Sequence, residues 1–373
     1  MVNINELLAM PTYINTIETA LPANLADQNQ IADFMVDHLG LDEREEKKLR
    51  VLYRASGIKQ RYSVLRDFAE NLNGQSFFKE DAFPSAKPRM LIYQKHAISL
   101  AKQASEKSIR SSDIEKGQVT HLIAVSCTGM YAPGLDIELI EHLGLSTTTQ
   151  RTSINFMGCY AAFNAMKVAN NIISSNPDAK VLIVCVELCS IHLQEKKDDE
   201  NLLANAIFGD GAAAMILTSS PSSKSLEMRN FFSDLALDAR DEMGWYIGDH
   251  GFEMHLSSKV PDVIKDGIGE LTNRLLEKIQ LEVADIDFFA IHPGGKRILD
   301  VIEAKLSITK EQNAAAREIL RTHGNMSSPT VLFVIKKILE GMTPDDNQKH
   351  LLSFAFGPGL TMESAVLKTH IDA

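Results

Sequence analysis

The stretch His121-Leu-Ile-Ala-Val-Ser126 has a counterpart in the second half of the chain, Asp287-Phe-Phe-Ala-Ile-His292. Each is a short apolar run that ends in a polar residue. The match continues downstream, because Cys159 lies 33 residues after Ser126 and Asn325 lies 33 residues after His292. Both later residues open a helix-like apolar pattern. A repeat of this length indicates a duplicated fold unit.

The order of the remaining patterns agrees with a duplication. Short runs rich in β-branched and aromatic residues predict buried strands at 119–126, 180–187, 288–292 and 351–356. Apolar residues at helical spacing predict helices at 88–108, 134–143, 159–174, 261–279, 297–305 and 327–339. Strands that alternate with helices favour an α/β fold. Residues 209–217 also resemble residues 357–367, so we expect both halves to end in the same way.

The small polar residues at 218–225 predict the linker between the two halves of the chain. We therefore expect one half at residues 1–219 and the other at residues 220–373.

Composition narrows the class of protein. The chain has 373 residues, of which 45% are hydrophobic and 23% charged, which is typical of a globular protein. The formal charge of −11 argues against general nucleic-acid binding. The apolar runs are too short to span a membrane, the N-terminus lacks the pattern of a signal peptide, and four cysteines do not form a disulfide framework. We therefore expect a cytoplasmic protein with reduced thiols and no membrane span.

Cys159, His292 and Asn325 are the candidate catalytic residues. Cys159 follows Gly158 at the start of a predicted helix, where the helix dipole favours a thiolate. His292 ends a strand and precedes Pro-Gly-Gly, which leaves room for a ligand. The Asn325 amide can donate to an oxyanion. Each residue alone also fits a structural role, as a buried thiol or a turn residue, but the duplication brings together a trio suited to nucleophilic acyl chemistry.

Two weaker patterns remain open. Cys185, Cys189 and His192 have a metal-like spacing, but no fourth ligand is evident, and we predict no metal site. Lys47, Arg50 and Arg54 share one face of a predicted helix and suit a phosphate-rich ligand. Because glutamates are adjacent at 43, 45 and 46, the same face also fits a solvated helix of mixed charge.

Four motifs in register resemble those of the type III polyketide synthases, the chalcone and stilbene synthase family of the thiolase-like superfamily. They are Gly158-Cys159, His292-Pro-Gly-Gly295, Gly324-Asn-Met-Ser-Ser328 and Phe356-Gly-Pro-Gly-Leu360. The resemblance runs from Ile58-Lys-Gln-Arg-Tyr62 to the C-terminus. It implies a duplicated, five-layered αβαβα fold and a homodimer. It also implies an acyl-CoA starter and malonyl-CoA as substrates, with no other cofactor.

The resemblance also implies roles for the candidate residues. Cys159 would take the starter acyl group and hold the growing chain, while His292 and Asn325 would stabilise the enolate left by decarboxylation of malonyl-CoA. A further hypothesis is that His292 keeps Cys159 as a thiolate. Coenzyme A contacts are implied at Lys47, Arg50, Arg54, Gly294 and Gly295.

The implied substrate pocket departs from that of the plant enzymes. Its residues are Cys127, Cys189, His192, Phe208, Trp245, Met254, Ser327, Phe356 and Pro358. Cys127, Cys189 and His192 stand at threonine positions of the plant enzymes, Trp245 at a glycine and Met254 at a gate phenylalanine, whereas Phe208 keeps the other gate. Ala132-Pro133 occupies the loop that crosses the dimer in the family. This lining favours an aliphatic starter and an alkylpyrone or alkylresorcinol product.

Two other functions fit the same trio. A β-ketoacyl carrier-protein synthase of the third type shares the cysteine, histidine and asparagine, and would depend on a carrier protein. A cysteine hydrolase would also use these residues in this order, although the duplication and the glycine-rich loop after His292 argue against it.

Overall fold

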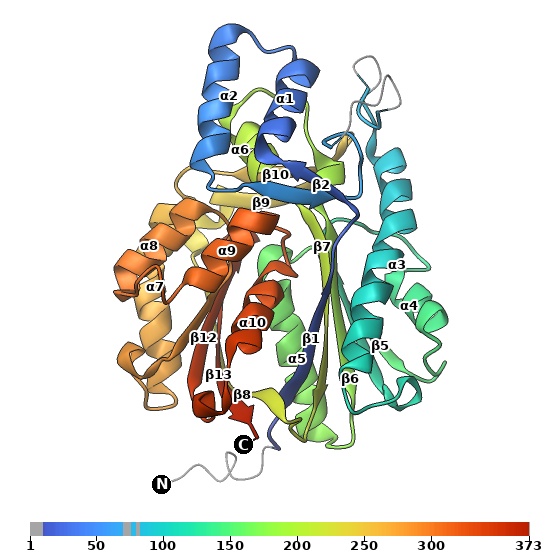
Figure 1. The fold of residues 1–373 in the computed structure, drawn as a ribbon, viewed down its shortest axis with the longest axis vertical. Helices are drawn as coiled ribbons and strands as arrows, with labels where there is room; N and C mark the ends of the chain where they lie inside the picture. The colour runs from blue at the N-terminus through green and yellow to red at the C-terminus, as the bar shows by residue number, and fades with distance from the viewer. Residues whose placement is uncertain (1–9, 70–75, 80–82, 373) are drawn as a thin grey trace.

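A single mixed sheet runs through the computed structural model, which describes residues 10–69, 76–79 and 83–372. Its strand order is β11-β12-β13-β8-β1-β7-β6-β4-β5 (Figure 1). The strands from the first half of the chain are β1 (Tyr13–Ala20), β4 (His121–Ser126), β5 (Gln150–Asn155), β6 (Val181–Leu188) and β7 (Asp210–Thr218). The strands from the second half are β8 (Lys224–Leu235), β11 (Phe288–Ile291), β12 (His350–Gly357) and β13 (Thr361–Ile371).

The two halves of the sheet repeat one topology. In the first half β4 runs parallel to β6, and β6-β7 and β7-β1 are antiparallel. In the second half β11 runs parallel to β12, and β12-β13 and β13-β8 are antiparallel. The predicted duplication is therefore confirmed, with β7 and β13 as the matching final strands. The halves meet where β1 pairs with β8, at only two pairs of residues.

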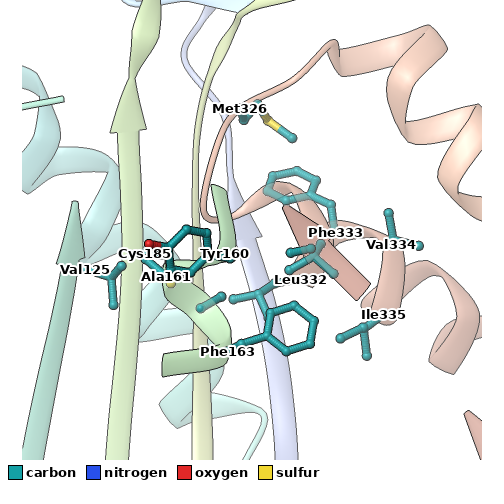
Figure 2. Close-up of a cluster of buried hydrophobic side chains, with 14 of the residues drawn as sticks. Val125, Tyr160, Ala161, Phe163, Cys185, Met326, Leu332, Phe333, Val334 and Ile335 are labelled. Atoms are coloured by element: carbon teal, nitrogen blue, oxygen red, sulfur yellow. The ribbon is translucent and has the colours of Figure 1, made fainter. Parts of the chain in front are cut away.

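Helices complete five layers around the two halves of the sheet (Figure 1). The central helices α5 (Ala161–Ser175) and α10 (Thr330–Gly341) contact strands of both halves. One outer layer contains α3 (Ala86–Arg110) and α4 (Leu135–Leu143), and the other contains α7 (Val260–Glu277), α8 (Lys296–Leu306) and α9 (Ala314–His323). Figure 2 shows the core cluster to which both central helices contribute, with Phe163 from α5 and Leu332 and Ile335 from α10. The predicted αβαβα layering is confirmed.

A cap covers one end of the sheet, at the top of Figure 1. It contains the helices α1 (Gln28–Leu39), α2 (Glu43–Ala55) and α6 (Asp199–Ile207). It also contains the two-stranded sheet β2-β3 (Asn24–Asp27, Gln60–Ser63) and the hairpin β9-β10 (Met243–Gly248, Gly251–Leu256). Among the described residues no helix is long and apolar enough to cross a membrane.

The predicted strands and helices all occur, with shifts of a few residues at their ends. Of the strands in the large sheet, β1, β5, β7, β8 and β13 were not predicted. Strand β5 lacks an apolar pattern, because it lies at the edge of the sheet and most of its side chains are exposed. The boundary between residues 219 and 220 stays a prediction.

Candidate active site

A cavity lies between the carboxyl ends of the parallel strands and the cap. It holds about 1240 Å³ of empty space, counted out to its open mouth. The three candidate catalytic residues line it, as do all nine predicted pocket residues: Cys127, Cys189, His192, Phe208, Trp245, Met254, Ser327, Phe356 and Pro358. The structure therefore gathers residues from both halves of the chain around one space.

Cys159 lies in a short 3-10 turn, Gly158–Tyr160, directly before α5. Gly158 has φ +78°, and a Cβ atom there would lie 2.5 Å from Cδ of Pro358. The Gly-Pro-Gly segment after β12 thus packs against the turn that carries the thiol, and only glycine fits at residue 158. The predicted helix begins two residues later than expected, because these residues adopt the tighter turn.

His292 follows β11 directly and continues its ladder, since its amide donates to the carbonyl of Phe354 at 2.8 Å. The side chain is 1% exposed. Neither ring nitrogen has a hydrogen-bond partner among the described residues. The residue lines the cavity, and a buried nitrogen without a partner can bind a polar group there.

Asn325 joins the thiol to the loop after His292. Its side-chain oxygen and nitrogen each lie 3.9 Å from Sγ of Cys159, and Nδ2 donates to the carbonyl of Gly294 at 3.3 Å. Its Oδ1 accepts from the amide of Ser327 at 2.8 Å, which fixes the orientation of the side-chain amide. Ser327 itself has φ +58°, a strained conformation for a residue with a side chain.

Burial shifts the pKa values of Cys159 and His292 in opposite directions. It raises the pKa of the Cys159 thiol to about 11, with hydrogen bonds from Ser327 and Asn325 acting in the opposite direction. Burial also lowers the pKa of His292 to about 3. Each group by itself is thus neutral near pH 7. This opposes the hypothesis that His292 holds Cys159 as a thiolate, because desolvation outweighs the helix terminus.

Glu187 is a site residue that the sequence did not reveal. It is fully buried at the end of β6, and burial raises its pKa while hydrogen bonds from Ser328 and from the loop after β4 lower it. Its carboxylate accepts from Thr128 Oγ1 at 2.7 Å, from the Cys127 amide at 3.0 Å and from Ser328 Oγ at 2.6 Å. Glu187 therefore links the loop after β4, in the first half of the chain, to Ser328 in the second half. An acidic residue inside an otherwise apolar strand was the available signal.

Trp245 and His192 form one wall of the cavity. The Trp245 Nε1–H donates to the carbonyl of Cys127 at 2.7 Å, and its ring meets His192 edge-on at 5.5 Å between centroids. His192 stacks on Phe252 at 4.5 Å. Its Nδ1 accepts from the Phe252 amide at 2.9 Å, and its Nε2 lies 2.7 Å from the carbonyl of Thr128. Both ring nitrogens are thus engaged, which leaves none for a metal. Among the described residues, no group of three or more histidine, cysteine, aspartate or glutamate side chains is arranged to hold a metal ion.

The predicted coenzyme A contacts are only partly at the cavity. Gly294 lines it, whereas Gly295 and the three basic residues of α2 do not. Arg50 is engaged with Asp33 and Glu46, each at 2.7 Å. Beyond the end of α2, a Cβ atom at Gly57 would lie 3.2 Å from Cδ of Lys296. The end of α2 thus lies against the start of α8, close to the glycine-rich loop.

Family models match most of the chain. The N-terminal domain of chalcone and stilbene synthases matches residues 7–221, and their C-terminal domain matches residues 235–370. These matches agree with the resemblance carried by the four motifs.

Individual relatives give the same result. The alpha-pyrone synthesis polyketide synthase-like Pks18 of Mycobacterium tuberculosis is 31% identical over 363 residues, covering 95% of this chain and 91% of that protein. The crystal structure of PKS-I from the brown alga Ectocarpus siliculosus has a TM-score of 0.90 at 29% identity, over 96% of this chain and 98% of that one. The C-terminal type III polyketide synthase domain of Steely1 from Dictyostelium also reaches 0.90, at 28% identity, over 97% of this chain and all of that domain. The chain belongs to the chalcone and stilbene synthase family of type III polyketide synthases, and is a condensing acyltransferase with the thiolase-like fold.

Proposed function

We propose that Cys159 takes an aliphatic acyl group from coenzyme A and extends it with malonyl-CoA to a pyrone or resorcinol. The observation that carries the proposal is the convergence of Cys159, His292 and Asn325 on one cavity, where neither ring nitrogen of His292 has a hydrogen-bond partner among the described residues. Family membership supports a condensing reaction, and the geometry supports these residues as its agents.

Loading begins with proton transfer. The neutral thiol of Cys159 must lose its proton to attack the starter thioester. His292 would relay this proton rather than hold it, because burial lowers its pKa to about 3 and disfavours the imidazolium. The sulfur then forms the bond to the acyl carbon while the bond to coenzyme A breaks. The proton passes to the departing thiolate.

Extension needs donors rather than a strong base. The Nδ2 group of Asn325 and a ring N–H of His292 would hold the thioester oxygen of malonyl-CoA. When the carboxylate leaves as carbon dioxide, its bonding electrons form an enolate that these donors stabilise. The enolate carbon attacks the acyl group on Cys159, and the thiolate leaves. Transfer of the longer chain back to Cys159 permits another round.

The cavity wall supports an aliphatic starter. Its lining includes the apolar side chains of Ile31, Phe68, Leu193, Leu256 and Ile298. Burial of an alkyl chain against such a wall contributes about 0.8 kcal/mol per methylene. The name of the mycobacterial relative, alpha-pyrone synthesis polyketide synthase-like Pks18, supports a pyrone product.

The phosphates of coenzyme A would lie where α2 meets the start of α8. Arg54 in the last turn of α2 and Lys296 at the start of α8 supply positive charge there, and Lys296 also lies 3.6 Å from Asp300. Lys47 lies further back along α2. The first amides of α8 add the positive end of a helix dipole. Arg50 would have to exchange its two carboxylate partners to join them.

A homodimer would complete the sheet. The edge strand β5 pairs only with β4, and nearby Met130 and Ile137 are 48% and 41% exposed. An unpaired edge beside exposed apolar side chains favours pairing with a second copy.

Light scattering during size-exclusion chromatography should give the mass of a dimer, and a monomer at micromolar concentration would contradict this proposal.

The function is tested by incubating the purified enzyme with malonyl-CoA and a panel of acyl-CoA starters. We expect carbon dioxide release and pyrone or resorcinol products by mass spectrometry, with aliphatic starters preferred because the wall is apolar. Free acid alone would indicate a hydrolase. Activity only with an acyl carrier protein would indicate a carrier-protein synthase, and a preference for aromatic starters would overturn the assigned substrate class.

The state of the thiol is tested by alkylation of Cys159 with iodoacetamide. Only the thiolate reacts, and the raised pKa of about 11 means that its fraction grows with pH. We expect the rate to rise about tenfold per pH unit between about pH 6 and pH 9, without an inflection from His292, which is already neutral there. A rate that is constant across this range would instead establish a thiolate–imidazolium pair.

Trp245 should set the length of the chain that the cavity accepts. We expect Trp245→Gly to shift products toward longer starters or further extensions, because it removes the indole from the wall. Trp245→Phe is the matched control, since it also loses the hydrogen bond to Cys127 but keeps most of the ring volume. A product distribution that changes equally in both variants would show that the hydrogen bond, not the volume, is decisive.

A further inference from the structure

We infer that Arg61 is a positioning residue that holds Asn325 in place for decarboxylation. This inference rests on the proposed function, because it assigns a step of that reaction to the residue. Arg61 lies on β3 and is 6% exposed. It forms no ion pair with any residue that the structure describes. Burial lowers its pKa, while Tyr53 and the charge of Asp210 act in the opposite direction. A buried guanidinium without a carboxylate within ion-pair distance is costly, and its contacts therefore call for an explanation.

The guanidinium binds the C-terminal end of α6. Its Nη1 donates to the carbonyls of Asn205 at 2.9 Å and Phe208 at 2.5 Å. Its Nε donates to Oε1 of Gln28 at 3.0 Å, and Nε2 of Gln28 donates to the carbonyl of Ala206 at 2.8 Å. The last carbonyls of a helix lack partners within it and form the negative end of its dipole. Arg61 and Gln28 thus satisfy three carbonyls at this end of α6.

Asn325 is bound to the same end of α6. Its amide donates to the carbonyl of Ile207 at 2.8 Å, and its carbonyl accepts from the amide of Gly209 at 2.9 Å. These two bonds form a parallel bridge between Phe208 and Asn325. Arg61 thus fixes Asn205 and Phe208, and their chain neighbours Ile207 and Gly209 hold the backbone of Asn325.

Close packing leaves little freedom in this arrangement. A Cβ atom at Gly324 would lie 2.7 Å from the carbonyl oxygen of Ile207 and 2.9 Å from Cδ of Arg61. A Cβ atom at Gly209 would lie 2.8 Å from the carbonyl oxygen of His323. The side chain of Arg61 thus touches the residue before Asn325 as well as its partners on α6. Any shift of Arg61 would move the Asn325 amide relative to Cys159 and the bound thioester.

The two partial reactions depend on this placement to different extents. Decarboxylation requires the Asn325 donor within hydrogen-bond distance of the thioester oxygen, and small displacements weaken such donors steeply. Loading of Cys159 requires the thiol and a proton acceptor. A positioning role for Arg61 therefore predicts a selective loss of decarboxylation, whereas a general structural role would lower both reactions alike.

The test compares both reactions in Arg61→Lys, which keeps the charge but cannot span two carbonyls and Gln28. We expect the kcat of malonyl-CoA decarboxylation to fall by about tenfold or more, with KM and the rate of Cys159 acylation within about threefold of the wild type. Decarboxylation is measured as carbon dioxide release, and acylation by intact-protein mass spectrometry. Thermal melting and circular dichroism check the fold.

Two further variants keep the test decisive. Arg89→Lys is the matched control, because Arg89 is also fully buried but donates to the carbonyls of Ile191 and Leu193, away from Asn325. It should change both reactions by a similar factor. Gln28→Met should give a smaller loss in the same direction as Arg61→Lys, and it decides the matter if the latter does not fold.

The possible failures are distinguishable. A wild-type enzyme that does not decarboxylate malonyl-CoA would refute the proposed function itself. An active wild type with equal losses of both reactions in Arg61→Lys, or with no loss in either, would overturn only the role of Arg61. If Arg61→Lys does not fold, equal losses of both reactions in Gln28→Met, or no loss in either, would overturn the role of Arg61 in the same way.

Discussion

Two backbone hydrogen bonds between Asn325 and the end of α6 are the constraint on which the site depends. They join a residue of the second half of the chain to Ile207 and Gly209 of the first. The sheet itself joins the halves at only two residue pairs between β1 and β8. The relative placement of the candidate catalytic residues therefore relies on the packing of α5 and α10 and on contacts near the cavity. Glu187 adds a second such contact, through Ser328. Because these groups are buried, each bond is strong and each loss leaves an unpaired polar group.

The same burial determines the chemistry. Burial weakens the charged forms of Cys159 and His292 and shifts the pKa values of both groups. It also strengthens the dipoles of buried donors, because less solvent screens them. A neutral site with fixed donors suits a reaction in which negative charge develops on the substrate after carbon dioxide departs. The cavity beside this site is lined by residues of both halves of the chain.

Much of this arrangement was predictable from the sequence. The repeat of 33 residues placed Cys159 and Asn325 in equivalent positions, and the confirmed topology explains why duplication brings them together. The resemblance supplied the pocket residues, all of which line the cavity. Glu187 and Arg61 were not assigned roles, because their partners are backbone groups and residues far along the chain. The pairing of Arg50 with Asp33 could not be predicted either. The same is true of the raised pKa of Cys159, because the local sequence indicates a helix terminus but not how deeply the thiol is buried.

The central claim is that one thiol of several in the cavity carries the chain. Cys127 and Cys189 line the same space as Cys159, and Cys185 lies buried beside it in β6. The most direct measurement is peptide mapping by mass spectrometry after incubation with an acyl-CoA, followed by malonyl-CoA. We expect the acyl label on Cys159 alone, and we expect it to lengthen by whole ketide units after malonyl-CoA is added. The label should be absent in Cys159→Ala and retained in Cys185→Ala. Label on Cys127 or Cys189 in the wild type, or acylation that survives in Cys159→Ala, would contradict this claim.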